Sequence, residues 1–241
     1  MKPSELSRRL FQALNTTWPA AEYIEHGPWM LRRGLGGGKR VSAASTEIDV
    51  TANDIADAEA HMRAMGQDPI FVIHTGDETL DSALADEGYR IVDPVLILAT
   101  DCAELASTVP PPLAAIPGDE PLAIMREIWA DGGIGTARLE VMARVTTPKT
   151  YLFSRHDIDK PGGCAFVAMD GDIAMLHALE IVPAARRKGV GRALLQRAAN
   201  WALEQGATVF SVVTTGENLP AQGLFTGLGL RVVDKYHYRM K

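Results

Sequence analysis

The sequence predicts an α/β fold, and three observations support this prediction. Strand-like and helix-like segments alternate through the second half of the 241-residue chain, which is typical of layered α/β domains. The hydrophobic fraction of 46% and the charged fraction of 22% are those of an ordinary soluble globular chain. Prolines cluster between Pro110 and Pro121, and because proline removes backbone donors, this segment indicates a linker between two domains. A long loop within one domain is the alternative.

The first half, residues 1–108, is expected to hold short elements. Ile55, Ala58 and Met62 recur at helical spacing, and glycines 36–38 separate two strand-like runs. The glycine-rich, basic run from Gly34 to Arg40 is interpreted as a hairpin turn. The predicted helices span 3–14, 54–65 and 80–87, and the predicted strands span 29–33, 40–47, 70–74 and 89–98, the last one interrupted at Asp93-Pro94.

The second half, residues 109–241, alternates more regularly. A turn over 157–163 joins its first two long strands, and Gly206 closes its longest helix. The predicted helices span 122–131, 138–145, 191–205 and 219–228, and the predicted strands span 150–155, 164–169, 172–182, 209–214 and 231–239.

An internal echo connects the two halves. Thr75-Gly76 follows a strand and precedes a helix, a glycine and another strand, and Thr215-Gly216 does the same about 140 residues later. A duplicated fold explains this echo. Two unrelated units that share a glycine at the end of a helix explain it as well.

The basic run from residue 186 to residue 192 carries the strongest chemical signal. It holds four cations and no acid, although the net charge of the chain is −6. The run opens a long helix, whose first N–H groups and dipole attract anions. A multiply charged phosphate group is the natural ligand, and a merely solvated helix start is the alternative. The residues are Arg186, Arg187, Lys188, Gly189, Val190, Gly191 and Arg192.

Two other phosphate motifs do not fit. Gly38-Lys39 has Arg33 where a Walker loop needs its first glycine, and Gly189-Val190-Gly191 is followed by Leu194 where a dinucleotide fingerprint needs glycine. Arg186-x-x-Gly189-x-Gly191 instead resembles the [Gln/Arg]-x-x-Gly-x-[Gly/Ala] signature of the GNAT superfamily of N-acetyltransferases. The later residues Asn218, Ala221, Leu224, Phe225 and Gly229 are similar to a second pattern of that family. The resemblance covers roughly residues 113–239, with a first short strand near 113–116.

The resemblance implies acetyl-CoA as the cosubstrate and an amine as the acceptor. Backbone N–H groups from Arg187 to Arg192 would hold the pyrophosphate. The backbone of Ile181 and Val182 would pair with the pantetheine arm where the fourth and fifth family strands splay. Asn218 would hydrogen-bond the arm from the other side, and Phe225 stands where the family often has an acidic tyrosine.

Acetyl transfer to an amine also needs a base, and an acid helps the thiolate to leave. His177 is the first candidate for the base and Glu180 the second, because strand alternation puts Leu179 and Ile181 on the face of His177, with Glu180 on the other face unless a bulge intervenes. Tyr236 or Tyr238 would replace the missing acid, or water would protonate the thiolate. The alternatives are a core histidine, a solvated glutamate and tyrosines that only pack.

Together these observations predict two GNAT-like mixed-sheet domains with helices on both faces. Residues 109–241 would be the catalytic N-acetyltransferase domain, using direct attack in a ternary complex, and residues 1–108 a degenerate copy without a pyrophosphate loop. A non-enzymatic acyl-CoA-binding sensor or interaction module is the second hypothesis. The acceptor would be a small molecule or a peptide.

Charge and composition limit the other partners. The net charge of −6 disfavours a general nucleic-acid binder, and no apolar run approaches membrane-spanning length. With only two cysteines, we expect a cytoplasmic protein, and a homodimer is one option for its assembly. The histidines and cysteines show no metal-ligand spacing, so no metal is expected.

Overall fold

A computed structural model of the chain describes residues 4–157 and 159–241. Pro3, the start of the first predicted helix, and Ile158 in the predicted turn lie outside the described residues. The helices and strands are α1 (Glu5–Thr17), β1 (Glu22–His26), β2 (Trp29–Arg33), α2 (Ala52–Ala64), β3 (Ile70–His74), α3 (Glu78–Asp86), β4 (Arg90–Asp101), α4 (Cys102–Ala106), β5 (Ile116–Gly118), α5 (Ala123–Asp131), α6 (Thr136–Arg144), β6 (Lys149–His156), β7 (Lys160–Asp170), β8 (Ile173–Ile181), α7 (Val190–Glu204), β9 (Val209–Thr215), α8 (Leu219–Thr226) and β10 (Arg231–Met240). Two 3-10 turns, η1 (Lys39–Val41) and η2 (Pro183–Ala185), complete them.

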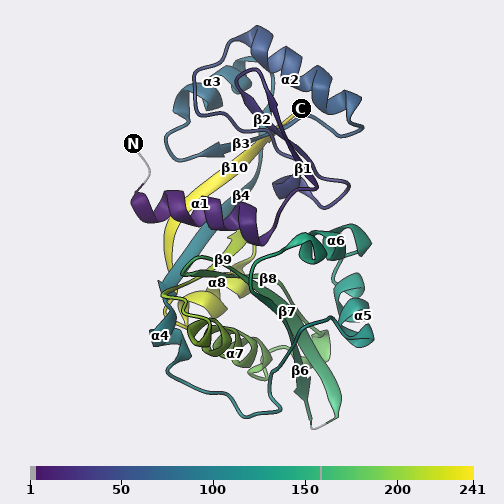
Figure 1. Ribbon diagram of the computed structural model, residues 1–241, viewed down its shortest axis with the longest axis vertical. Coiled ribbons are helices and arrows are strands. Elements are labelled where there is room, and N and C mark those ends of the chain that lie inside the picture. The colour runs from purple at the N-terminus through teal and green to yellow at the C-terminus, as the bar shows by residue number, and fades with distance from the viewer. Residues whose placement is uncertain (1–3, 158) are drawn as a thin grey trace.

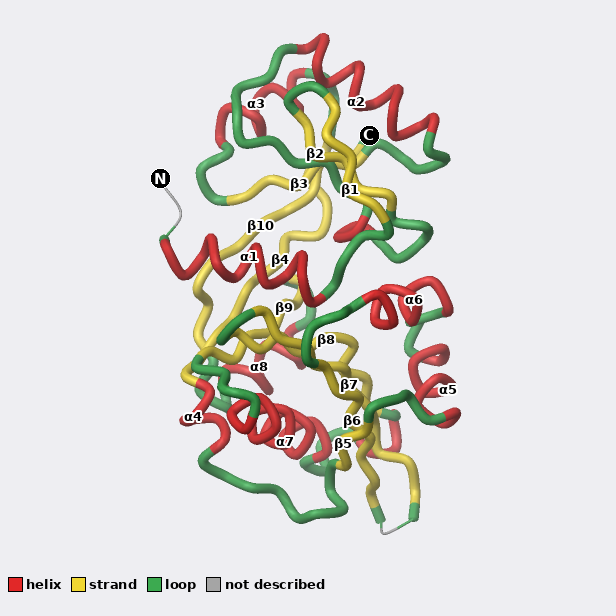
Figure 2. Tube along the Cα trace, viewed as in Figure 1, coloured by secondary structure: helices red, strands yellow, loops and turns green. Residues whose placement is uncertain are grey.

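One eight-stranded mixed sheet runs through the molecule in the order β3-β10-β4-β9-β8-β7-β6-β5 (Figure 1). The pair β8–β9 is parallel, and the other neighbouring pairs in this sheet are antiparallel. β1 and β2 form a separate hairpin at the end of the molecule that also holds α2 and α3 (Figure 2). The α/β prediction is confirmed.

Helices cover both faces of the sheet and leave an apolar layer on each. On one face, Leu194 and Leu195 of α7 pack with Phe210 of β9 and Leu98 of β4. On the other face, α5 and α6 pack against β6 and β7, and Trp129 is fully buried there. α1 crosses β7, β8 and β10 and buries Leu10 between the two ends of the molecule. The sheet is therefore a rigid platform for any site at its strand ends.

The strands of the two halves interleave. β4 lies between β9 and β10, and β10 lies between β4 and β3. If one half is superposed on the other by placing Arg90 on Arg231, the cross-strand pairs of these four strands coincide away from the bulges of β4 and β10. The matching cross-strand pairs are Arg231 with Ala99 and Arg90 with Met240, and also Tyr236 with His74 and Val95 with Thr215. The last strand of each half therefore lies between two strands of the other half.

The order of elements repeats as well. β2, η1, α2, β3, α3 and β4 follow one another as β8, η2, α7, β9, α8 and β10 do. The repeated order extends the sequence echo from a few residues to six elements. The boundary at residue 109 stays a prediction, because the shared sheet crosses it.

Several predicted elements differ from the structure. The strand predicted at 40–47 is wrong, because residues 39–41 form η1 and only Ala44 and Ser45 make isolated bridges. Strand β1 and helix α4 were missed. β4 runs through Asp93-Pro94 without ending, because Asp93 adopts a positive φ of 45° and the register with β10 shifts there. The proline therefore marks a bulge and not a break.

Candidate active site

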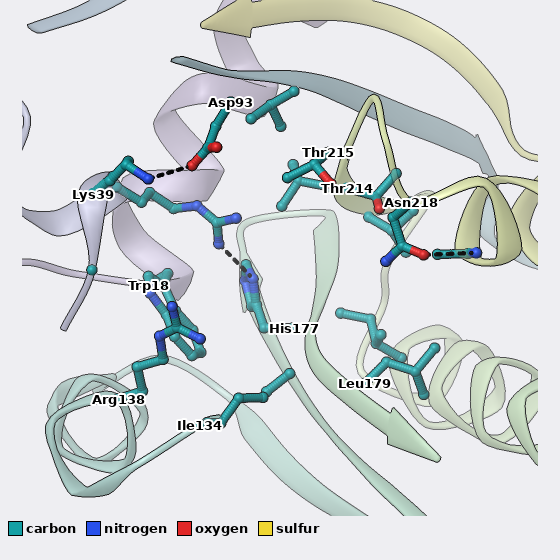
Figure 3. A pocket seen from close by; sticks show the side chains of 18 of the residues that line it. Trp18, Lys39, Asp93, Ile134, Arg138, His177, Leu179, Thr214, Thr215 and Asn218 are labelled. Carbon is teal, nitrogen blue, oxygen red and sulfur yellow. Dashed lines mark hydrogen bonds and ion pairs between the residues drawn. The ribbon is translucent and has the colours of Figure 1, made fainter. Parts of the chain in front are cut away.

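Strands β8 and β9 diverge about halfway along their length. Their parallel pairing ends at Leu176 and Val212, although β8 continues to Ile181 and β9 to Thr215. A cavity of about 560 Å³ opens at this divergence. Leu179, Thr214 and Asn218 line it, and Figure 3 shows their side chains around the opening. This splay was predicted from the resemblance, and the structure places it at the predicted strands.

A bulge interrupts β8 inside the cavity. Cys164 pairs with Glu180 and Phe166 with His177, so two residues of β8 face one residue of β7. Ala178 takes a positive φ of 50° at this point, and its carbonyl accepts a hydrogen bond of 2.7 Å from Trp129 Nε1. The bulge rotates every later side chain to the opposite face.

The face assignment made from strand alternation is therefore wrong. His177 and Glu180 lie on one face of β8, because their partners Phe166 and Cys164 share a face of β7. Leu179 and Ile181 lie on the other face and pack with the α7 core. Both predicted bases thus share one side of the strand.

His177 lies at the centre of the cavity and is almost fully buried (4% exposed). Thr17 donates its hydroxyl proton to Ala13 O at 2.6 Å, so His177 Nε2–H donates to Thr17 Oγ1 at 2.9 Å. The other ring nitrogen, Nδ1, therefore carries a lone pair, and Arg40 NH1 lies 3.4 Å from it. Burial, and then the positive charge of Arg40, hold the pKa of His177 well below its usual range.

Glu180 lies outside the bulge and next to the end of α5. Its Oε1 lies 3.6 Å from an Arg186 nitrogen. Gly132 leaves the space it occupies, because a Cβ at that position would lie 2.5 Å from Oε2. Among the described residues, His177 lines the cavity and Glu180 does not, so the structure separates the two candidates by access.

The start of α7 holds residues 186–192, which were predicted to bind an anion and are called the cradle below. Arg186, Arg187 and Lys188 are exposed, and Lys188 pairs with Asp157 at 3.2 Å. Gly189 caps the helix with a φ of 84°, which glycine adopts at little cost. Gly191 lies so close to α8 that a Cβ would approach Leu224 Cδ2 to 2.8 Å. Val190 is buried, so it anchors the helix start while Arg192 stays exposed.

The residues predicted along the pantetheine arm differ in what they can still bind. Val182 N–H donates to Gly162 O at 3.1 Å, and Val182 O accepts from Ala185 N. Its backbone is therefore already engaged. Ile181, the residue before Val182, pairs with Gly163 of β7, and its carbonyl accepts from Arg186 Nε at 3.2 Å.

Asn218 and Phe225 line the side of the cavity that α8 provides. Asn218 Oδ1 caps α8 by accepting from Ala221 N at 3.2 Å, so its amide nitrogen is the group that remains for a ligand (Figure 3). Phe225 is buried and belongs to the α7 core. Its ring closes the cavity with an apolar surface.

Tyr236 and Tyr238 also line the cavity, from β10. Their rings pack edge to face with centroids 5.6 Å apart, and both are buried. The Tyr236 hydroxyl makes no well-aligned hydrogen bond, although Arg40 lies beside it. Burial, and then the neighbouring Tyr236, hold the pKa of Tyr238 well above its usual range, so Tyr238 keeps its proton at neutral pH.

The first half contributes cavity residues that were not predicted to belong to the site. Trp18 and the run from Gly37 to Arg40 line the cavity opposite the splay, and Asp93 pairs there with Lys39 at 2.6 Å. The glycine-rich, basic run is therefore a cavity wall and not a hairpin turn. Two adjacent cations beside three glycines were the signal that could have indicated a ligand site.

Comparison with known proteins identifies the fold family. Residues 123–230 match the Acetyltransferase (GNAT) family. This segment of the chain is a GNAT acetyltransferase domain. The matched residues include the splayed strands, the bulge and the cradle at the start of α7, so the GNAT assignment rests on the same segment as the cavity. The prediction of an acyltransferase is confirmed at this level.

Several relatives and solved structures are similar to this chain, and some of them are similar over almost its whole length. A Bacillus subtilis (strain 168) protein described as "Uncharacterized N-acetyltransferase YobR" is 25% identical over 97% of this chain and 98% of its own length. An aminoglycoside N(6')-acetyltransferase type 1 from Klebsiella aerogenes is 29% identical over 37% of this chain and 67% of its own. A GCN5-related N-acetyltransferase from Kribbella flavida has a TM-score of 0.68 at 19% identity, covering 97% of this chain and 94% of its own.

A tandem GNAT protein from the clavulanic acid biosynthesis pathway, solved without AcCoA, has a TM-score of 0.65 at 12% identity and covers 100% of this chain and 90% of its own. These structures show the same fold over both halves.

Metal sites and membrane-spanning helices are two further features that bear on function. Within residues 4–157 and 159–241, no cluster of three or more His, Cys, Asp or Glu side chains is placed to hold a metal ion. In the same part of the chain, no helix combines the length and apolarity that a membrane span requires.

Proposed function

We propose that this GNAT chain transfers an acetyl group from acetyl-CoA to an amine acceptor by direct attack in a ternary complex. The observation that supports the proposal most strongly is the divergence of β8 and β9 beyond Leu176 and Val212, with the α7 cradle beside it. The open edge of β8 can pair with an extended arm, and the helix start can bind phosphate oxygens. Acetyl-CoA, as substrate, supplies an activated acetyl group in its thioester.

The residues present fit this substrate. Gly189 has open space where a Cβ would be, so oxygens can approach the backbone there. Arg186, Arg187 and Lys188 place three exposed cations around the same turn. Charge-assisted hydrogen bonds contribute about 1.5–3 kcal/mol each, so a few of them are enough for micromolar binding.

Direct attack is favoured because both cysteines are poor nucleophiles. Cys102 and Cys164 are buried, and their sulfurs face the carbonyls of Ala199 and Met125. Burial raises the pKa of Cys102 to about 11, and burial raises the pKa of Cys164 further. An acetyl-cysteine intermediate would need a thiolate, which neither site supports at neutral pH.

The proton balance of the transfer is simple. An acceptor that enters as an ammonium loses one proton to a base or to water before it attacks. The C–N bond of the amide then forms as the thioester C–S bond breaks, and the second nitrogen proton leaves with the thiol.

We also propose that the first half shapes the acceptor side of this site and binds no CoA itself. Helix α2 stands in the chain order where α7 stands in the second half, but Asp54 occupies its N-terminus. The Asp54 carboxylate accepts from Thr51 N at 2.8 Å within a capping box. A carboxylate at that position repels phosphate.

Calorimetry and a thiol-release assay test the proposed function. We expect saturable acetyl-CoA binding and thiol release that depends on an amine, with initial-rate lines that intersect when both substrates are varied. Parallel lines would indicate a covalent intermediate and would contradict direct attack. Tight binding without turnover on a broad amine panel would favour the acyl-CoA sensor, for which Phe225 in place of an acidic tyrosine is the supporting observation.

A further inference from the structure

The wall of the cavity that faces the splay is rich in positive charge. Lys39, Arg40 and Arg138 line it, and Asp93 is the one carboxylate among the described lining residues. Asp93 is already paired with Lys39 at 2.6 Å. Within residues 4–157 and 159–241, neither Arg40 nor Arg138 has a carboxylate partner, so two guanidinium groups face this space without a counter-charge.

Arg40 is the better enclosed of the two. Its guanidinium lies over the Trp18 ring, 5.9 Å from the centroid, and its Nε is buried without a hydrogen bond. The contact with His177 Nδ1 at 3.4 Å is long, and His177 is neutral. Enclosing an arginine without an anion is unfavourable, because the charge loses part of its hydration. An anion from outside the chain would complete this site.

The Tyr236 hydroxyl lies beside the Arg40 guanidinium, as the Tyr238 hydroxyl does. The Tyr236 hydroxyl is buried without a well-aligned hydrogen bond, and Arg40 can only donate to it, so Arg40 cannot accept its proton. A buried hydroxyl is normally paired. One oxyanion between the two residues would accept from the guanidinium and from the hydroxyl.

We propose that the acceptor is an amine that carries an anionic group, a carboxylate or a phosphate, close to its nitrogen, and that Arg40 and Tyr236 bind this group. The proposal rests on the proposed function, which places the amine in the same cavity. It names a substrate class: α-amino acids or short aminoalkyl phosphates. Polycationic amines fit poorly, since Lys39, Arg40 and Arg138 would repel them.

Acceptor pairs that differ in one charge test the proposal directly. Amino acids, their carboxamides and an aminoalkyl phosphate such as phosphoethanolamine are compared in the thiol-release assay at fixed acetyl-CoA. We expect kcat/KM to be at least tenfold higher for acids than for carboxamides, and Arg40→Met to remove this preference. Arg63→Met, on the exposed surface of α2, should retain it. A preference for phosphoethanolamine over all amino acids would identify phosphate as the group.

A binding measurement separates this proposal from the proposed function. N-acetyl amino acids and their amides are titrated calorimetrically into the wild-type chain with CoA present, a readout that needs neither turnover nor a variant. Equal binding of acid and amide would overturn the anionic acceptor, whether or not the chain is active. Turnover of neutral or polycationic amines in preference to acids would overturn it while leaving the acetyltransferase in place. Equal losses for acids and carboxamides in Arg40→Met would also overturn it, because Arg40 would then act elsewhere.

Discussion

His177 shows how neighbours can change the chemistry of a residue that the sequence marks as a base. Its protonated nitrogen is committed to Thr17, and its lone pair faces a guanidinium. Burial disfavours the charged ring, and a proton taken up at Nδ1 would also lie against Arg40, so the pKa of His177 falls. The residue is better suited to position Arg40 than to collect a proton from an ammonium group.

A pH–rate comparison tests this interpretation of His177. Glutamine at 177 can still donate to Thr17 and accept from Arg40, so we expect His177→Gln and wild type to share one shape of kcat/KM against pH, with no ionisation near neutrality. Glu180→Gln is the comparison variant, and a loss of about 10²–10⁴-fold with a missing ionisation would make Glu180 the base. An ionisation near pH 7 that disappears only in His177→Gln would restore His177 as the base.

The lowered pKa values of His74 and His177 also determine how stability depends on pH. Burial, and then Arg32, lower the pKa of His74 to about 4. A histidine whose folded pKa is depressed binds more protons when unfolded, so stability is fully present above about pH 6.5 and falls as the pH drops toward 4. His74 alone would account for up to about 3 kcal/mol of this loss, at 1.36 kcal/mol per unit. His177 adds to it in the same direction.

Urea unfolding at a series of pH values measures this effect. We expect the free energy of unfolding to decrease between pH 6.5 and pH 4, and His74→Gln to reduce the slope. The exposed His61 on α2 offers the control, and His61→Gln should leave the slope unchanged. A slope that is the same in both variants would mean that His74 is not the group that titrates.

At the scale of elements, the hydrophobic patterns predicted regular helices and strands correctly, but they did not predict local irregularities. The strand predicted at 70–74 coincides with β3, which is a short continuous apolar run. α7 begins within one residue of its prediction, because it carries a periodic apolar face between Gly189 and Gly206. The bulge at Ala178 was not predictable, since nothing in Ala178 itself requires a positive φ. It depends on Trp129, 49 residues away, which holds the carbonyl.

The cavity wall formed by Gly37 to Arg40 was not predicted, for a related reason. Residues 34–41 show no apolar periodicity, so the glycines that precede η1 predicted a hairpin turn. Its place in the cavity follows from long-range contacts: a Cβ at Gly37 would lie 2.7 Å from Val141 of α6. Only the folded chain brings η1, α6 and β8 together.

The cradle at the start of α7 gives a prediction with a matched control. Gly189 and Gly206 flank the same helix, and both have a positive φ with open space around the Cβ position. Valine at either position therefore introduces similar backbone strain, about 1–2 kcal/mol. We expect Gly189→Val to weaken acetyl-CoA binding at least tenfold, and Gly206→Val to lose stability without losing affinity. Calorimetric binding and thermal unfolding are measured for both. Equal affinity in the two variants would contradict the cradle.

The exchange of last strands determines how the whole molecule holds together. Taken alone, residues 109–241 would keep β10 without β3 and β4, and β9 would lose its antiparallel neighbour. The apolar residues of β4 that pack into two cores, including Ile97 and Leu98, would be absent. Strand edges left open in this way are prone to aggregation. The second half was predicted to be a separate catalytic domain, but the shared sheet makes its last strands depend on the first half.

Expressing the chain in two pieces, split at the proline-rich segment between α4 and β5, tests this dependence. That segment joins the halves and carries no strand of the shared sheet, although Pro110 O accepts a hydrogen bond from Arg197 at 3.2 Å. We expect fragment 109–241 alone to be insoluble or to lack acetyl-CoA binding, and co-expression with fragment 1–108 to recover a one-to-one complex that binds acetyl-CoA. Binding is measured by calorimetry and assembly by light scattering. Full affinity in the isolated fragment 109–241 would mean that its sheet closes without β4, and that the interleaved strands add stability but are not needed for the CoA site.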